Sequence, residues 1–269
     1  MPHASYKTVI DAPYDRVSAL LVDKMEWPKK YVGAILYSSV LERGDGYIIR
    51  EMYQPKPVDL MIREKIYHHD VDGGQEFVYE HIDNASYTGT FRNIVTRVPG
   101  DDSKVEVEYV MGWDPQPGTV DKISDDAAKA NVEHGVNHLK AMAENEVDVP
   151  DWVREFYDVV DSMGSDAMAP LLAEKVTFRM GNGPVVVGRD NVIAGSREVT
   201  KMFAGLHHDY VAVHQSGFST FVDCWVTYSM FDDKTYVLPF LTVFDRVDDE
   251  ITGVKIFGDL SPLRYGWPA

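Results

Sequence analysis

The chain has 269 residues, of which 45% are hydrophobic and 26% are charged, a balance typical of globular proteins. Its formal net charge is −17, from 26 basic and 43 acidic residues, so phosphate backbones and anionic lipid surfaces would repel it. We therefore expect neither a nucleic acid nor a membrane as a partner.

The chain has a single cysteine, Cys224, which excludes an internal disulfide and a cysteine-rich metal site. The N-terminal stretch MPHASYKTVIDAPYD lacks the basic segment and the apolar run that are typical of a signal peptide. No apolar run approaches the roughly 18 residues of a membrane span. We expect a cytoplasmic protein.

The first half of the chain predicts one sheet and two main helices. SYKTVI alternates in strand fashion, and DAPYDRVSALLVD predicts a helix with Asp11 as N-cap and Pro13 just inside. Six strand-like segments with turns between them follow between residues 34 and 113, which indicates a meandering antiparallel sheet. A helix from about Val120 to Glu144 closes this half, and a sheet curled around it would leave a cavity.

The acidic, proline-containing stretch NEVDVPD at residues 145–151 indicates a boundary. After it, PDWVREFYDVVDSM, DAMAPLLA and RDNVIAGSREVTKMFAG predict three helices, while EKVTFRM and four longer segments predict strands. Three helices on a strongly bent antiparallel sheet would form a cone whose mouth holds a small molecule. We predict an α+β protein with two domains, residues 1–147 and 150–269.

Segments along both halves carry a family resemblance. FYDVVDSMGSD, LLAEKVTFRM, VVVGRDNV, WVTYSMFDDKTYVLPFLTVFDRV and ITGVKIFGDLSPL resemble the SnoaL-like branch of the nuclear transport factor 2 superfamily, which includes ketosteroid isomerase and polyketide cyclases. YKTVIDAPYDRVSALLVDK, EWPKKYVGAI, VLERGDGYIIREM and VEYVMGW resemble the SRPBCC or START-like helix-grip superfamily, near its AtaL-like members. The resemblance implies a cone-shaped α+β barrel in the second half. In the first half it implies an antiparallel sheet wrapped on a long C-terminal helix, with a cavity for a hydrophobic ligand.

Ketosteroid isomerase chemistry needs a carboxylate base, a tyrosine donor and a protonated aspartic acid. By the resemblance, Tyr157 matches the tyrosine, the base position falls at Met180, and the second donor falls near Leu241. Methionine cannot take a proton and leucine cannot donate one, so we reject simple 3-oxosteroid isomerisation. Phe178 shares a strand face with Met180, and we expect Phe178, Met180 and Leu241 to contact a substrate.

A histidine pair opens the strand-like segment HHDYVAVHQ. Strand alternation places His208, Tyr210, Ala212 and His214 on one face. The resemblance implies a histidine that faces the pocket at this point, and His208 fits best, although the adjacent His207 leaves the facing ambiguous. An imidazole with an unperturbed pKa of about 6.5 could shuttle a proton at neutral pH. The alternative is a hydrogen-bonded histidine at the rim.

Three more side chains complete the candidate site, each with a structural alternative. Tyr157 either contacts the ligand as an acid or packs in the core. The resemblance places Tyr228 in the pocket lining, where it would donate to a ligand carbonyl, and the alternative is a core aromatic. Asp259 ends the last strand, where an apolar pocket could raise its pKa toward that of a working acid or base. Its alternative is an Asx-type turn or cap.

We expect no metal and no cofactor. His134 and His138 lie at i and i+4, a metal-ligand spacing, but the sequence fixes no third ligand. GDG and DGG are interpreted as hairpin turns, GNGP lacks the lysine of a phosphate loop, and no GxSxG elbow is present.

Together these features predict a cofactor-independent enzyme that acts on a hydrophobic, oxygenated small molecule such as a polyketide, terpenoid or aromatic. The reaction would be proton transfer in a cyclase, isomerase, dehydratase or lyase step. The catalytic candidates are His208, Asp259 and Tyr157, and Tyr228 heads the substrate-binding group. The alternative is a carrier protein that binds a hydrophobic molecule without turnover. We also expect a homodimer through the open face of the second sheet.

Overall fold

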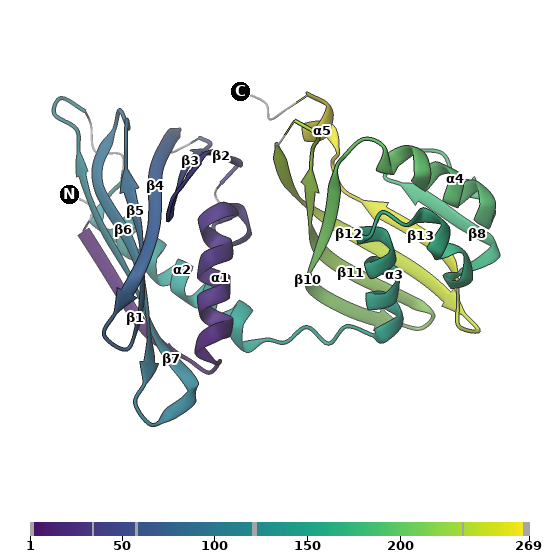
Figure 1. Ribbon diagram of the computed structural model, residues 1–269, viewed down its shortest axis with the longest axis horizontal. Coiled ribbons are helices and arrows are strands. Elements are labelled where there is room, and N and C mark those ends of the chain that lie inside the picture. The colour runs from purple at the N-terminus through teal and green to yellow at the C-terminus, as the bar shows by residue number, and fades with distance from the viewer. Residues whose placement is uncertain (1–2, 34, 57–58, 120–122, 233, 266–269) are drawn as a thin grey trace. The chain divides into compact units, whose positions relative to one another are not determined.

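The computed structural model describes residues 3–33, 35–56, 59–119, 123–232 and 234–265. The chain divides into two compact units, Met1–Glu146 (unit 1) and Val147–Ala269 (unit 2), and each is described by itself (Figure 1). Both units combine helices with one large sheet, so the protein has an α+β fold.

Unit 1 is built on a seven-stranded antiparallel sheet with the strand order β1-β7-β6-β5-β4-β3-β2. Its elements in chain order are β1 (His3–Ile10), α1 (Tyr14–Glu26), the 3-10 helix η1 (Pro28–Lys30), β2 (Tyr37–Gly44), β3 (Tyr47–Gln54), β4 (Leu60–Val71), β5 (Gly74–His81), β6 (Tyr87–Val98), β7 (Asp101–Pro115) and α2 (Asp125–Glu144).

The two long helices of unit 1 pack on this sheet, α1 against β6 and β7 and α2 against β1 and β7 (Figure 1). Pro13, not Asp11, occupies the N-cap position of α1, and the Asp11 backbone N–H donates instead to Glu144. The Ser124 side chain caps α2 by accepting from the Ala127 backbone, whereas the predicted helix start near Val120 lies outside the described residues. The assignment of unit 1 to the helix-grip superfamily stays a prediction.

Unit 2 has a six-stranded sheet with the order β10-β11-β12-β13-β8-β9. Its elements are α3 (Asp151–Asp161), the 3-10 helix η2 (Ser165–Leu171), β8 (Leu172–Met180), β9 (Val186–Val187), α4 (Arg189–Thr200), β10 (Gly205–Ser216), β11 (Ser219–Ser229), β12 (Thr235–Val247), β13 (Glu250–Phe257) and α5 (Ser261–Tyr265). The sequence predicted a wholly antiparallel sheet, but β8 and β13 pair in parallel. The short helix α5 was not predicted from the sequence.

The helical periodicity of α3 and the strand alternation of β10 determine which of their side chains face the interior of unit 2. Val153, Phe156 and Tyr157 form the buried stripe of α3. On β10 the pairing register shifts between Tyr210 and Ala212, a β-bulge at Val211. The predicted common face therefore holds from His208 to Tyr210 and is wrong from Ala212 onward, where the inserted residue reverses the alternation.

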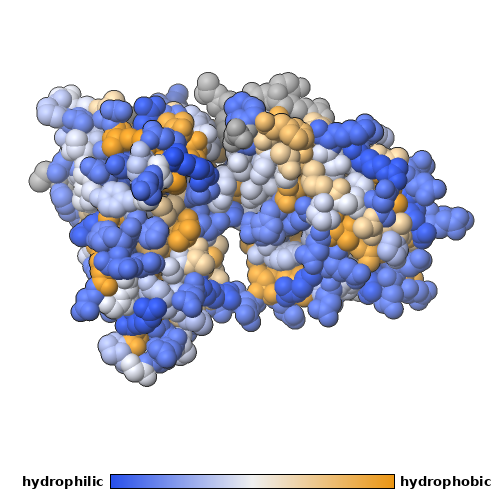
Figure 2. All heavy atoms as spheres, in the orientation of Figure 1, coloured by the Kyte–Doolittle hydropathy of each residue, from blue (hydrophilic) through white to orange (hydrophobic). Residues whose placement is uncertain are grey.

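The face seen in Figure 2 carries mostly hydrophilic side chains with smaller hydrophobic areas, in line with the net charge of −17. Within the described part of the chain, none of the helices has both the length and the apolar character needed to cross a membrane.

Candidate functional site

Unit 2 contains a cavity of about 380 Å³ between the sheet and the helices α3, η2, α4 and α5. Most of its lining is aliphatic, aromatic or methionine side chains, and the lining residues include no aspartate, glutamate, lysine or arginine. The polar or ionisable groups in the lining are few: Tyr157, Asn191, Ser196, Thr200, His208, Tyr228 and Thr242. A cavity of this composition suits an uncharged, hydrophobic ligand that carries a small number of oxygen atoms.

His208 is held in the cavity wall by a carboxylate behind it. The His208 Nδ1 atom lies 2.6 Å from Asp161 Oδ1, and the His208 backbone N–H donates to Asp161 Oδ2 at 2.9 Å. The side chain of His208 is 10% exposed, whereas that of the adjacent His207 is 66% exposed. The ambiguity between the two histidines is therefore resolved: His208 lines the cavity and His207 does not.

The Asp161 carboxylate determines which nitrogen of the His208 ring carries the proton. With Nδ1–H donating a hydrogen bond to Asp161, the neutral imidazole of His208 carries a lone pair on Nε2. Nε2 makes no hydrogen bond to the part of the chain that the structure describes, and the residue lines the cavity. The same carboxylate would stabilise the imidazolium that forms when Nε2 takes up a proton.

The sequence analysis missed Asp161. It is the last residue of α3, one helical turn after Tyr157, and this i, i+4 spacing on the buried side was the available signal. An aspartate at a helix C-terminus faces the negative end of the helix dipole, an unfavourable place unless a cation or donor is near. The partner could not be recognised from the sequence because His208 lies 47 residues further along the chain.

Tyr157 lines the same cavity and touches the histidine. Its ring centroid lies 4.3 Å from that of His208, and the residue is 3% exposed. Burial raises the pKa of its hydroxyl well above the usual value, and the nearby Cys224 adds to this, while Thr242 acts in the opposite direction. The hydroxyl has no hydrogen-bond partner of good geometry among the described residues. Tyr157 is therefore a protonated donor in a position to meet a ligand oxygen.

Three of the predicted contact residues also line the cavity: Phe178, Met180 and Tyr228. The Tyr228 ring packs edge-on against Phe203 at 5.3 Å, and burial is the main cause that raises the pKa of its hydroxyl. A raised pKa keeps Tyr228 a hydrogen-bond donor across the neutral range.

Two predicted positions were wrong. Leu241 is 38% exposed and lies outside the cavity lining, because strand alternation on β12 turns its neighbours Phe240 and Thr242 inward. Asp259 also lies outside the lining and forms an Asx-type turn just before α5, with its two carboxylate oxygens accepting from the backbone N–H and the hydroxyl of Ser261 at 2.8 Å each. The bond from the Ser261 backbone lowers the pKa of Asp259, opposite to the rise that a catalytic acid would need.

The other candidates from the sequence form no site. His134 and His138 stack with their ring centroids 6.2 Å apart on α2. His138 Nε2 lies 3.1 Å from the Lys30 carbonyl oxygen. The described residues include no cluster of three or more histidine, cysteine, aspartate or glutamate side chains suited to a metal ion.

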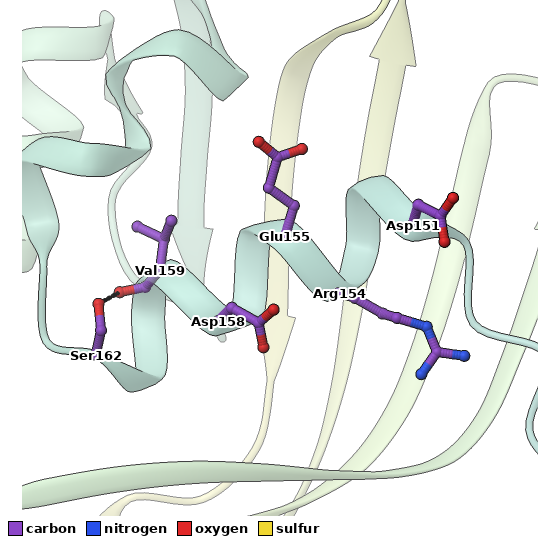
Figure 3. Close-up of a pocket in the computed structure, with 6 residues that line it drawn as sticks. All are labelled: Asp151, Arg154, Glu155, Asp158, Val159 and Ser162. Atoms are coloured by element: carbon purple, nitrogen blue, oxygen red, sulfur yellow. Dashed lines mark hydrogen bonds between the residues drawn. The ribbon is translucent and has the colours of Figure 1, made fainter.

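A second hollow lies on the surface along α3, lined by Asp151, Arg154, Glu155, Asp158, Val159 and Ser162 (Figure 3). All six residues belong to α3 and the position that follows it, and the charged side chains spread apart rather than converge (Figure 3). The internal cavity, with its paired His208 and Asp161, is the better candidate for chemistry.

Comparison with known proteins finds a family similarity in unit 2. The model of the SnoaL-like domain family matches residues 153–254, which is most of this unit. No curated protein matches the chain.

Solved structures resemble unit 2 at low identity. A hypothetical protein with a ketosteroid isomerase-like fold from Catenulispora acidiphila is 16% identical with a TM-score of 0.41, over 44% of this chain and 93% of that one. A putative SnoaL-like polyketide cyclase from Jannaschia sp. is 16% identical with a TM-score of 0.41, over 46% and 99%. An NTF2-like protein of unknown function from Burkholderia pseudomallei is 19% identical with a TM-score of 0.40, over 44% and 95%. Similarities with such low sequence identity and TM-score are not evidence about activity.

Proposed function

We propose that unit 2 catalyses proton transfer on an uncharged, hydrophobic small molecule that carries a carbonyl or phenol oxygen, in a cyclisation, isomerisation, dehydration or lyase step. Polyketides, terpenoids and aromatic ketones have this chemistry. The observation that carries the proposal is the pairing of His208 with Asp161, which leaves the second imidazole nitrogen for the ligand in a largely apolar cavity.

The proposed mechanism begins with a ligand whose carbonyl oxygen accepts a hydrogen bond from Tyr157 or Tyr228. His208 Nε2 then takes the proton from the carbon next to this carbonyl, and the electron pair of the broken C–H bond moves to the oxygen as an enolate. Asp161 stabilises the imidazolium, and the tyrosine donor stabilises the oxyanion. In an isomerisation the imidazolium returns the proton to a different carbon of a conjugated enolate, which re-forms the carbonyl and shifts the double bond. In a ring closure the enolate carbon instead attacks a second carbonyl carbon of the ligand, whose π electron pair moves to its oxygen, and the imidazolium protonates that alkoxide.

The rival function is binding without turnover. Met180, at the position where the resemblance places the base of ketosteroid isomerase, lines the cavity with a thioether that cannot accept a proton. The two functions differ in the fate of the ligand: a carrier releases it unchanged.

The test incubates the protein with a panel of bicyclic aromatic ketones and follows both binding, by calorimetry, and product, by liquid chromatography with mass detection. We expect conversion by the wild type and a loss of about 10²–10⁴-fold in rate with His208→Ala. His214→Ala, on the exposed end of the same strand, is the matched control and should keep full activity. Saturable binding of the ketones with no conversion would support the carrier and contradict the enzymatic proposal.

A further inference from the structure

The interior of unit 1 contains a second group of polar side chains, separate from the cavity of unit 2. The strand register places them in three neighbouring rows on one face of the sheet. The rows are Arg50, Glu64 and His81 on β3, β4 and β5; Tyr79 and Phe91 on β5 and β6; and Asn93 and Tyr109 on β6 and β7.

Lys24 enters this group from α1. Its Nζ atom donates to Asn93 Oδ1 at 2.8 Å. The same atom lies 4.1, 5.2 and 5.3 Å from the ring centroids of Tyr109, Phe91 and Tyr79. The ammonium therefore has one oxygen partner and three aromatic faces, and Lys24 as a whole is 5% exposed.

Several polar atoms around Lys24 lack partners. The hydroxyls of Tyr79 and Tyr109 and the side-chain nitrogen of Asn93 are buried and make no hydrogen bond to the described residues. These residues are 2%, 1% and 0% exposed. Arg50 Nε and His81 Nε2, in the same group, are also buried without a partner among the described residues. A buried polar group without a partner costs about 1–3 kcal/mol, so the three around the Lys24 ammonium indicate a missing partner there.

When Lys24 is protonated, the group holds two positive charges, on Lys24 and Arg50, and one carboxylate, Glu64. Arg50 and Glu64 form a buried ion pair at 2.6 Å, and Arg50 also donates to the carbonyl oxygens of Lys24 and Met25. Glu64 balances the charge of Arg50, so the Lys24 ammonium has no carboxylate partner within this group. The unpaired groups include amide N–H and hydroxyl donors, which suit an acceptor.

From this arrangement we propose that the interior of unit 1 binds the carboxylate of a small ligand, held by the Lys24 ammonium, the Tyr79 and Tyr109 hydroxyls and the Asn93 amide. A carboxylate offers two oxygens with about four acceptor positions, enough for all four groups. Phe91 and the tyrosine rings would contact its apolar body.

The titration of Lys24 agrees with an incomplete site. Burial, followed by the nearby Arg50 charge, lowers the pKa of the Lys24 amine to about 7. A bound carboxylate would favour the ammonium and raise this pKa. Binding at pH 8 should therefore take up protons, which calorimetry in buffers of different ionisation enthalpy detects.

The experiment titrates the protein with acetate and benzoate, and with acetamide and benzamide as uncharged counterparts of the same shape. We expect saturable binding of a carboxylate to the wild type, at least about tenfold weaker binding to Lys24→Met, and proton uptake in the wild type alone. Lys129→Met removes an exposed lysine from α2 and should bind like the wild type.

A second variant covers the case that Lys24→Met does not fold. Tyr109→Phe removes one oxygen atom and keeps the ring, and we expect carboxylate affinity to fall about tenfold, as for the loss of a hydrogen bond to a charged group. The proposal is overturned if neither carboxylate binds, or if carboxylate affinity is the same in the wild type and in these variants.

Discussion

Asp161 and His208 form the smallest unit of structure on which the proposed function depends. The carboxylate contacts both the ring and the backbone of His208, so it sets the orientation and the protonated nitrogen of the imidazole together. In the proposed function, a histidine held in this way would act as a general base of defined geometry rather than as a freely rotating side chain.

We predict that Asp161→Asn lowers kcat on a converted ketone by about 10²–10⁴-fold and changes KM little. The amide can donate to Nδ1, which favours the tautomer with its proton on Nε2 and removes the base from the cavity. Steady-state kinetics with a melting curve as the folding control measures this. A kcat equal to that of the wild type would show that the carboxylate has no part in the reaction.

Tyr157→Phe should separate stability from function. The hydroxyl is buried and has no hydrogen-bond partner of good geometry in the described part of the chain, so its removal relieves a desolvation cost and we expect the free protein to become more stable by about 1 kcal/mol. Ligand affinity or turnover should fall at the same time because an oxygen donor is lost. Denaturant unfolding and ligand titration measure the two effects, and a fall in stability would mean that the hydroxyl has a partner in the free protein.

Lys24 gives unit 1 a defined pH dependence. Its pKa is about 7 in the folded protein against 10.5 for an ordinary lysine, so between these values the unfolded state binds more protons and stability rises with pH. We expect the unfolding free energy to increase from pH 7 to pH 9 and the increase to be smaller in Lys24→Met. Measurement stops at pH 9 because the buried tyrosines, with raised pKa values, lower stability near and above pH 10. Equal slopes in both proteins would contradict the prediction.

At the scale of elements, periodicity predicted most of the structure and failed at irregularities. The family resemblance together with strand alternation placed His208, Phe178 and Met180 in the cavity lining along β10 and β8, although alternation alone did not choose between His207 and His208. It failed beyond the bulge at Val211, because no local signal in HDYVAVHQ marks an inserted residue.

Other misses required contacts between distant segments. The parallel pairing of β8 with β13 and the partnership of Asp161 with His208 join residues far apart in the chain, which periodicity does not report. The family resemblance gave approximate positions only: Leu241 was one residue out of register with the cavity wall.

A pair of glycines tests how the elements of unit 2 shape the cavity. A Cβ atom on Gly258, after β13, would overlap the ring of Phe240, which lines the cavity, whereas a Cβ on Gly195 in α4 meets no atom. We predict that Gly258→Ala destabilises the fold by about 1–3 kcal/mol and weakens ligand binding, because Phe240 must move. Gly195→Ala should stabilise α4 by up to about 1 kcal/mol. Unfolding titrations compare the stability of the two variants, and ligand titration is applied to Gly258→Ala alone because Gly195 itself lines the cavity. Equal changes in stability would contradict the packing described here.

At the scale of the whole molecule, each unit has its own hydrophobic core. Within the described ranges, the core cluster of unit 1 has no residue in common with either of the two clusters of unit 2. We therefore predict that residues 1–146 and 147–269, expressed separately, each unfold cooperatively, and that the second piece keeps the ketone affinity of the whole chain. Loss of cooperative unfolding in either piece, followed by calorimetry, would show that the units depend on each other.

The most direct test of the central claim, that His208 moves a proton on a ligand in the unit 2 cavity, is deuterium exchange. The protein is incubated with 2-tetralone in D₂O, and loss of the proton signals next to the carbonyl is followed by NMR, which reports proton abstraction whether or not a net product forms. The account predicts that the wild type accelerates exchange by about 10²-fold or more over buffer and that His208→Ala does not. If 2-tetralone binds in the cavity and the wild type exchanges its protons no faster than His208→Ala, the account is wrong.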